Sequence, residues 1–220
     1  AHMRRMAPTR TEQTMRIYDV TAAPNPRRVR VFLAEKGLQV PLVQVDMARG
    51  EHKTPAFLAR NPSGKIPVLE LDDGTCIAES VAICRYFEAV HPEPNLFGRT
   101  PVELGRIEMT NRQLELELLA PVGVAWVNGP IVARIAAGRF QQIPAARTQA
   151  EAAVRRFHAR LDAELAGRPF MAGERYTIAD ITALCVIDFA TKLVELRPDD
   201  AHLHLWRWHA AVSSRPSASA

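Results

Sequence analysis

The hydrophobic pattern of this chain changes once, at a break that contains His91, Pro92, Glu93, Pro94 and Asn95. Two closely spaced prolines end a regular helix. Before the break, strand-like runs alternate with helix-like runs, and after it the apolar spacing is helical throughout. We therefore predict an α/β domain over residues 15–90, a linker over 91–100 and an all-helical domain over 101–216. The basic, polar residues 1–14 are expected to form a flexible tail.

The first half predicts a four-stranded sheet. Strand-like runs occupy residues 15–20, 40–45, 66–71 and 75–78, and the last two are joined by a turn at Asp72, Asp73 and Gly74. Helical patterns begin near Pro24 and end at Gly37, and recur over residues 53–60 and 80–89. The resulting order is strand–helix–strand followed by strand–strand–helix. The first unit requires parallel strands with a right-handed crossover.

The second half predicts helices over residues 101–119, 121–139, 144–166, 178–195 and 201–213, with a kink at Pro121 and an interruption at Gly129 and Pro130. Thr177 and Asp180 have the spacing of a capping box, in which each residue bonds the backbone of the other at the start of a helix. His202 and His204 have no third ligand at metal-binding spacing, so we interpret them as helix-surface residues.

The net charge and the cysteine content narrow the classes of binding partner and the cellular setting. The net charge is +4, which suits anionic small molecules, but no arginine–lysine cluster is interleaved with aromatic residues as in nucleic-acid-binding proteins. Arg27, Arg28 and Arg30 follow a helical pattern, and we predict a solvated helix face for them. No apolar run is long enough for a membrane span. Three cysteines without a CxxC pair favour a cytoplasmic protein with neither a disulfide framework nor a metal site.

Four segments in a fixed order resemble the cytosolic glutathione transferase superfamily, and the resemblance extends over nearly all of residues 15–216. They are residues 23–29 (APNPRRV) with 34–37 (AEKG), 61–69 (NPSGKIPVL), 79–80 (ES) and 176–181 (YTIADI). Residues 69–75 (LELDDGT) and 114–119 (LELELL) are similar to the yeast and bacterial subgroup that lacks the usual catalytic Tyr, Ser or Cys. The resemblance implies a thioredoxin-like domain that binds glutathione, followed by a helical domain that shapes the second substrate site.

The resemblance also implies where glutathione binds. Glu79 and Ser80 would meet the γ-glutamyl carboxylate at the start of a helix, where amide N–H groups and the helix dipole favour an anion. Ile66, before a cis-Pro67, would pair with the cysteinyl backbone, and His52 and Lys65 would meet the glycyl carboxylate. Each residue also has an ordinary structural interpretation: Ser80 as a simple helix cap, Pro67 as a trans edge-strand proline, His52 and Lys65 as solvated side chains.

The main difference from the family lies at the position of the side chain that activates the glutathione thiol. Ala23 stands where serine- and cysteine-type members carry their catalytic side chain, and alanine offers neither a hydroxyl nor a thiol. Thr21, Asn25 or backbone N–H groups alone could replace it. A disulfide-reducing bacterial group of the superfamily has Asn at the matching place, and we expect Asn25 to act together with the helix N-terminus.

The resemblance places the second substrate between the domains, against Leu119, Val122, Trp126, Asn128 and Phe140. Apolar residues at helical spacing are more often core, so most of these also fit a structural role. We expect a homodimer that conjugates glutathione, as co-substrate, to an apolar electrophilic small molecule. Two alternatives remain: glutathione-dependent disulfide reduction or peroxidase activity, and a non-catalytic interaction module.

Overall fold

The computed structural model describes residues 15–136, 138 and 141–220. The predicted tail over residues 1–14 lies outside the described residues. In the first half, four strands form one sheet in the order β2-β1-β3-β4. They are β1 (Arg16–Asp19), β2 (Leu42–Gln44), β3 (Val68–Glu70) and β4 (Cys76–Ala78). β1 and β2 are parallel, whereas β3 runs antiparallel to both β1 and β4, which confirms the predicted fold class.

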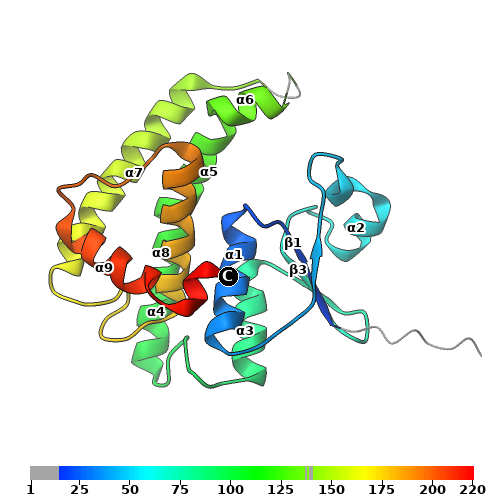
Figure 1. The fold of residues 1–220 in the computed structure, drawn as a ribbon, viewed down its shortest axis with the longest axis horizontal. Helices are drawn as coiled ribbons and strands as arrows, with labels where there is room; N and C mark the ends of the chain where they lie inside the picture. The colour runs from blue at the N-terminus through cyan, green and yellow to red at the C-terminus, as the bar shows by residue number, and fades with distance from the viewer. Residues whose placement is uncertain (1–14, 137, 139–140) are drawn as a thin grey trace, which may run out of the picture.

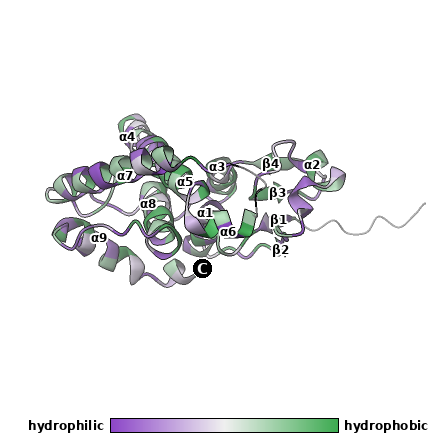
Figure 2. Cartoon of the chain, turned by 90° about the horizontal axis from the view of Figure 1, so that it is seen from above, coloured by the Kyte–Doolittle hydropathy of each residue, from purple (hydrophilic) through white to green (hydrophobic). Residues whose placement is uncertain are grey.

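Helices cover both faces of this sheet (Figure 1). α1 (Pro24–Glu35) and α3 (Ser80–Val90) pack against one another on the side that faces the second half of the chain. α2 (Pro55–Arg60), which follows the short 3-10 turn η1 (Glu51–Lys53), lies on the opposite side (Figure 2). Its Phe57 is buried against Tyr18, Val45 and Val68 in a small separate core.

The second half is helical, as predicted. Its elements are α4 (Pro101–Gln113), η2 (Leu114–Leu119), α5 (Ala120–Val127), α6 (Pro130–Ala136), α7 (Pro144–Leu165), α8 (Ile178–Phe189), η3 (Ala190–Val194), α9 (Leu203–Ser213) and η4 (Pro216–Ser219). Two of them, η2 and η3, are π-helical continuations of α4 and α8. Pro121 lies two residues after the end of η2. Because proline has no N–H to give to the ladder, a π-helical turn before it accommodates the loss. The interruption predicted at Gly129 and Pro130 is present between α5 and α6.

α8 is the central helix of the molecule. Ten consecutive residues from Ile178 to Ile187 are buried, and α8 packs on α1 on one side and on α4 on the other. The capping box is present: Asp180 Oδ2 accepts the Thr177 N–H at 2.9 Å. One hydrophobic core therefore runs from Ile17 and Phe32 in the first half to Leu184 and Trp208 in the second.

The arginines of α1 correct one prediction. Arg28 is 1% exposed and pairs with Glu115 at 3.1 Å, while Arg27 pairs with Asp188 and Arg30 with Asp19. The predicted solvated face is wrong because α1 lies between the sheet and the helical half, so its charged residues meet partners on both sides.

Within the described residues, no single helix is long and apolar enough to cross a membrane; the bent pair Pro101–Val127 and Pro130–Ala136, at 52° to one another, meets the length and composition test only when taken together.

Candidate active site

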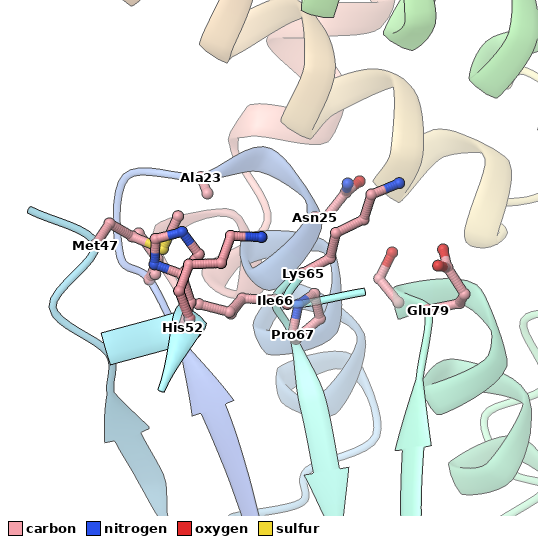
Figure 3. A pocket seen from close by; sticks show the side chains of 12 residues that line it. Ala23, Asn25, Met47, His52, Lys65, Ile66, Pro67 and Glu79 are labelled. Carbon is pink, nitrogen blue, oxygen red and sulfur yellow. The ribbon is translucent and has the colours of Figure 1, made fainter. Parts of the chain in front are cut away.

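A pocket of about 390 Å³ opens at the N-terminus of α1 (Figure 3). Seven of the predicted site residues line it: Asn25, His52, Lys65, Ile66, Pro67, Glu79 and Ser80. They come from α1, η1, the loop before β3 and the start of α3. The sheet topology brings these segments together, because the β1–α1 turn, the loop entering β3 and the end of β4 meet at one edge.

The loop before β3 offers free backbone to a ligand. The Ile66–Pro67 peptide bond is cis, and no hydrogen bond joins the Ile66 N–H or C=O to another described residue. Asn61 holds the loop in place, since its side chain donates to the Lys65 carbonyl at 2.8 Å and accepts from Ser63. An extended peptide can therefore bond to Ile66 as a short added strand.

Gly64 allows this loop to close on η1. It has φ +63°, and a Cβ added there would lie 2.9 Å from the His52 carbonyl oxygen. Both the backbone conformation and the close approach require glycine. The closure brings His52 and Lys53 beside Lys65 in the pocket lining.

The start of α3 forms one end of the pocket. Glu79, at φ +67°, precedes the helix, and Ser80 is its first residue and is 4% exposed. Ser80 is therefore not the N-cap, and its side-chain oxygen instead accepts a hydrogen bond from Arg28 Nη1 at 2.7 Å. The first N–H groups of a helix have no intrahelical acceptor, so at the start of α3 they and the positive end of the dipole are available to an anion.

The other end of the pocket is cationic. Lys53 and Lys65 line it together with His52, whose Nδ1 is buried with no partner among the described residues. Burial lowers the pKa of His52, and the neighbouring Lys53 lowers it further. Two ammonium groups and an imidazole nitrogen without a partner suit a carboxylate, because its oxygens accept hydrogen bonds.

The N-terminus of α1 has one available amide. Pro24 and Pro26 have no N–H, and the Arg27 N–H bonds to the Ala23 carbonyl at 3.2 Å. Asn25 therefore supplies the one N–H of this first turn without a hydrogen-bond partner among the described residues, and its buried Oδ1 is also unpaired there. Ala23 lines the same pocket with only a methyl group.

Thr21 lies apart from this arrangement. Its hydroxyl donates to Gln44 Oε1 at 3.0 Å, and it lines a second pocket, of about 470 Å³, between α1, the end of α8 and residues 218–220. The structure thus separates the two residues predicted as catalytic and leaves Asn25 alone in the first pocket.

Of the residues predicted to contact the second substrate, the four that the structure describes line neither of these two pockets. Val122 has no exposed surface and belongs to the core, and Leu119 packs against that core. Asn128 bonds the Val124 carbonyl and the Ile143 N–H, so it ties α5 to the chain before α7. Trp126 contacts Phe189, which lines the second pocket, edge-to-face at 5.3 Å. Phe140 lies outside the described residues.

Sequence reasoning missed Lys53 and Arg28. Lys53 adjoins the predicted His52, and the Gly64 contact that brings it to the pocket has no signal in the sequence. Arg28 lies three residues after Asn25 within a recognised motif, but its burial depends on distant residues. Among the described residues, no group of three or more His, Cys, Asp or Glu side chains is placed to hold a metal ion.

Comparison with known proteins agrees with this geometry. The family described as "Glutathione S-transferase, N-terminal domain" matches residues 22–90, and "Glutathione S-transferase, C-terminal domain" matches residues 125–216. The chain is 41% identical to Glutathione S-transferase 2 of Saccharomyces cerevisiae over 208 residues, which cover 94% of this chain and 88% of that protein. The chain belongs to the glutathione S-transferase family.

Solved structures of this family support the predicted subgroup. The crystal structure of Gtt2 from Saccharomyces cerevisiae matches with a TM-score of 0.86 and 39% identity, covering 93% of this glutathione S-transferase and 98% of that chain. A Gtt2-class transferase of Vibrio parahaemolyticus matches with a TM-score of 0.80 and 30% identity, covering 92% and 94% of the two chains. The predicted resemblance to yeast and bacterial transferases is confirmed.

Proposed function

We propose that this transferase binds glutathione in the pocket at the α1 N-terminus and conjugates its thiolate to an apolar electrophilic small molecule. The observation that carries the proposal is the convergence of Asn25, the Lys65–Pro67 loop and the Glu79–Ser80 turn on one pocket (Figure 3).

The chemistry of the pocket matches the three parts of glutathione. The γ-glutamyl carboxylate fits the start of α3 at Ser80, where amide groups and the dipole favour negative charge. The cysteinyl backbone fits the free N–H and C=O of Ile66. The glycyl carboxylate fits the cationic end formed by Lys53 and Lys65. This placement leaves the thiol facing Asn25 and Ala23.

Asn25 is the residue proposed to donate hydrogen bonds to the glutathione thiolate. A free thiol has a pKa of about 8.5, so little is ionised at neutral pH. The Asn25 backbone N–H, its side-chain amide and the α1 dipole each favour the charged sulfur, and together they would lower the pKa by about one or two units. In the reaction the thiol proton goes to solvent, the sulfur lone pair forms the new S–C bond, and the leaving group departs with its electron pair.

Reduction of small disulfides is the second candidate. Ala23 lacks the hydroxyl used in ordinary conjugation, and Asn25 occupies the place of the Asn found in disulfide-reducing members of the superfamily.

We further propose a homodimer, as is usual in this family. Two apolar side chains, Met109 on α4 and Leu116 on η2, are 56% and 59% exposed and are available to an interface.

Steady-state kinetics with an aryl halide and with a small disulfide test the proposal. We expect saturable conjugation, and Lys65→Ala should raise KM for glutathione about fivefold or more with little change in kcat, because a charged contact to the glycyl carboxylate is lost. Arg156→Ala, which removes an exposed cation on α7, is the matched control. Activity with the disulfide alone would favour the second candidate, and no glutathione-dependent activity with either substrate would refute both.

A further inference from the structure

Arg28 is a buried cation placed directly behind the proposed carboxylate site. It is 1% exposed, and its Nη1 lies 2.7 Å from Ser80 Oγ and 3.1 Å from Glu115 Oε1. Its Nε is buried with no partner among the described residues. Arginine is almost never fully buried unless it is paired, and here it reaches residues of α3 and of the helical half at once.

We propose that Arg28 is a positioning residue that makes the Ser80 site selective for peptides with a free γ-glutamyl α-carboxylate. The inference rests on the proposed binding of glutathione. A hydroxyl has one O–H donor and accepts through its lone pairs, while arginine only donates. Because Arg28 occupies the acceptor side of Ser80 Oγ, the single Ser80 proton remains available to the ligand. Ser80 lines the pocket, so this proton is directed toward an incoming carboxylate.

The charge of Arg28 is only partly neutralised. Glu115 Oε1 pairs with Arg28 and Glu115 Oε2 pairs with Arg112 at 3.1 Å, so two guanidinium groups share one carboxylate. Arg112 is half exposed, so solvent screens its charge, and the Glu79 carboxylate also lines the pocket beside Ser80. The Arg28 guanidinium is itself buried, where water screens little, and it therefore favours an anion at the start of α3 more than a surface arginine would.

The helical half holds Arg28 in this position. Glu115 belongs to the π-helical stretch η2, and the leucines on either side of its turn, Leu114 and Leu118, are buried in the core. Because these two leucines anchor η2, the Glu115 carboxylate is fixed against α1. The carboxylate site thus depends on both halves of the chain, although all its ligand contacts come from the first.

The test is calorimetric titration of the full chain with two ligands. One is glutathione, and the other is 4-aminobutyryl-cysteinyl-glycine, which lacks only the α-carboxylate of the γ-glutamyl group. Wild-type protein should prefer glutathione by about tenfold or more, the size expected of hydrogen bonds to a charged group. Arg28→Met should remove most of that preference and leave affinity for the analogue nearly unchanged. Ser80→Ala should then cost less in the Arg28→Met background than in wild type.

Controls separate positioning from folding. Arg27→Met removes a neighbouring arginine that pairs with Asp188 instead, and it should keep the preference. If Arg28→Met fails to fold by circular dichroism, Arg28→Lys answers the question: it keeps the charge, and the preference should be retained in part. Equal weakening of both ligands, or an unchanged preference in the Arg28 variants, would overturn the inference. Absence of glutathione binding to the wild type would instead refute the proposed function and the inference with it.

Discussion

At the residue scale, His158 is a buried base without a full set of partners. It lies on α7, is 2% exposed, and its Nε2 has no hydrogen-bond partner among the described residues. Burial, together with the smaller effects of the nearby His202 and Arg155, lowers its pKa to about 4. In the unfolded chain the same imidazole has its ordinary pKa of about 6.5. The folded protein therefore holds His158 neutral over a range where the unfolded chain binds a proton.

This difference predicts acid destabilisation. The stabilising effect of neutral His158 is complete above about pH 6.5 and is lost as the pH falls toward 4, because only the unfolded state then gains a proton. The free energy of unfolding should fall by about 2 kcal/mol between pH 7.5 and pH 5 from this group alone. Urea unfolding of the wild type and of His158→Gln measures it. An equally steep loss in the variant would show that other groups are responsible.

The residues of the site differ in how far the sequence could predict them. Six of them stand in short motifs that can be recognised in the sequence without any knowledge of packing. They are Asn25, Lys65, Ile66, Pro67, Glu79 and Ser80. Arg28 stands in such a motif too, but its partners Ser80 and Glu115 are 52 and 87 residues away. Helical spacing with neighbouring charges predicted a solvated face, because long-range ion pairs are not encoded in local spacing.

At the element scale, the start of α8 depends on one carboxylate. Asp180 accepts hydrogen bonds from the Thr177 N–H, the Met171 N–H and Trp208 Nε1, at 2.9, 2.9 and 2.8 Å. The capping box was predictable from the Thr177–Asp180 spacing. The bonds from Met171 and Trp208 were not, since they join α8 to the preceding loop and to α9.

Two substitutions should therefore differ in cost. Thr177→Ala should lower the free energy of unfolding by about 1 kcal/mol, the usual size of a lost cap. Asp180→Ala should cost about 3 kcal/mol or more, because four buried donors lose their acceptor, the Thr177 hydroxyl at 3.2 Å among them. Urea unfolding at pH 8 is the measurement, since burial raises the pKa of Asp180 to about 6 and the carboxylate is ionised at that pH. Equal costs for the two variants would contradict this account.

Helix boundaries show where element prediction ends. The interruption predicted at Gly129 and Pro130 is present, since α5 ends at Val127 and α6 begins at Pro130. The π-helical turn of η2 had no separate signal, because its leucines repeat much as in an α-helix. Its position is decided by Pro121 and by the burial of Leu114 and Leu118, which requires the packed structure.

At the scale of the whole molecule, the two halves form one packed body. α1 packs on α8, and Arg215, after α9, pairs bidentately with Glu35 at the end of α1, with both distances at 2.7 Å. The change of hydrophobic period predicted two halves but not this junction. The same limit affected the second substrate site: the predicted wall on α5 lines neither described pocket, while the pocket beside α1 and α8 arises from packing between distant segments.

We propose that the N-terminus of α1 holds glutathione as a thiolate through Asn25. The most direct measurement is the pKa of the bound thiol, followed by the ultraviolet absorbance of the thiolate as the pH is raised. Wild-type protein should show a pKa about one to two units below the value of about 8.5 for a free thiol. Asn25→Ala should lose much of this shift, while Thr21→Ala, whose hydroxyl bonds Gln44 outside the pocket, should keep it. A bound thiol that titrates like free glutathione, or an unchanged shift in Asn25→Ala, would contradict the claim.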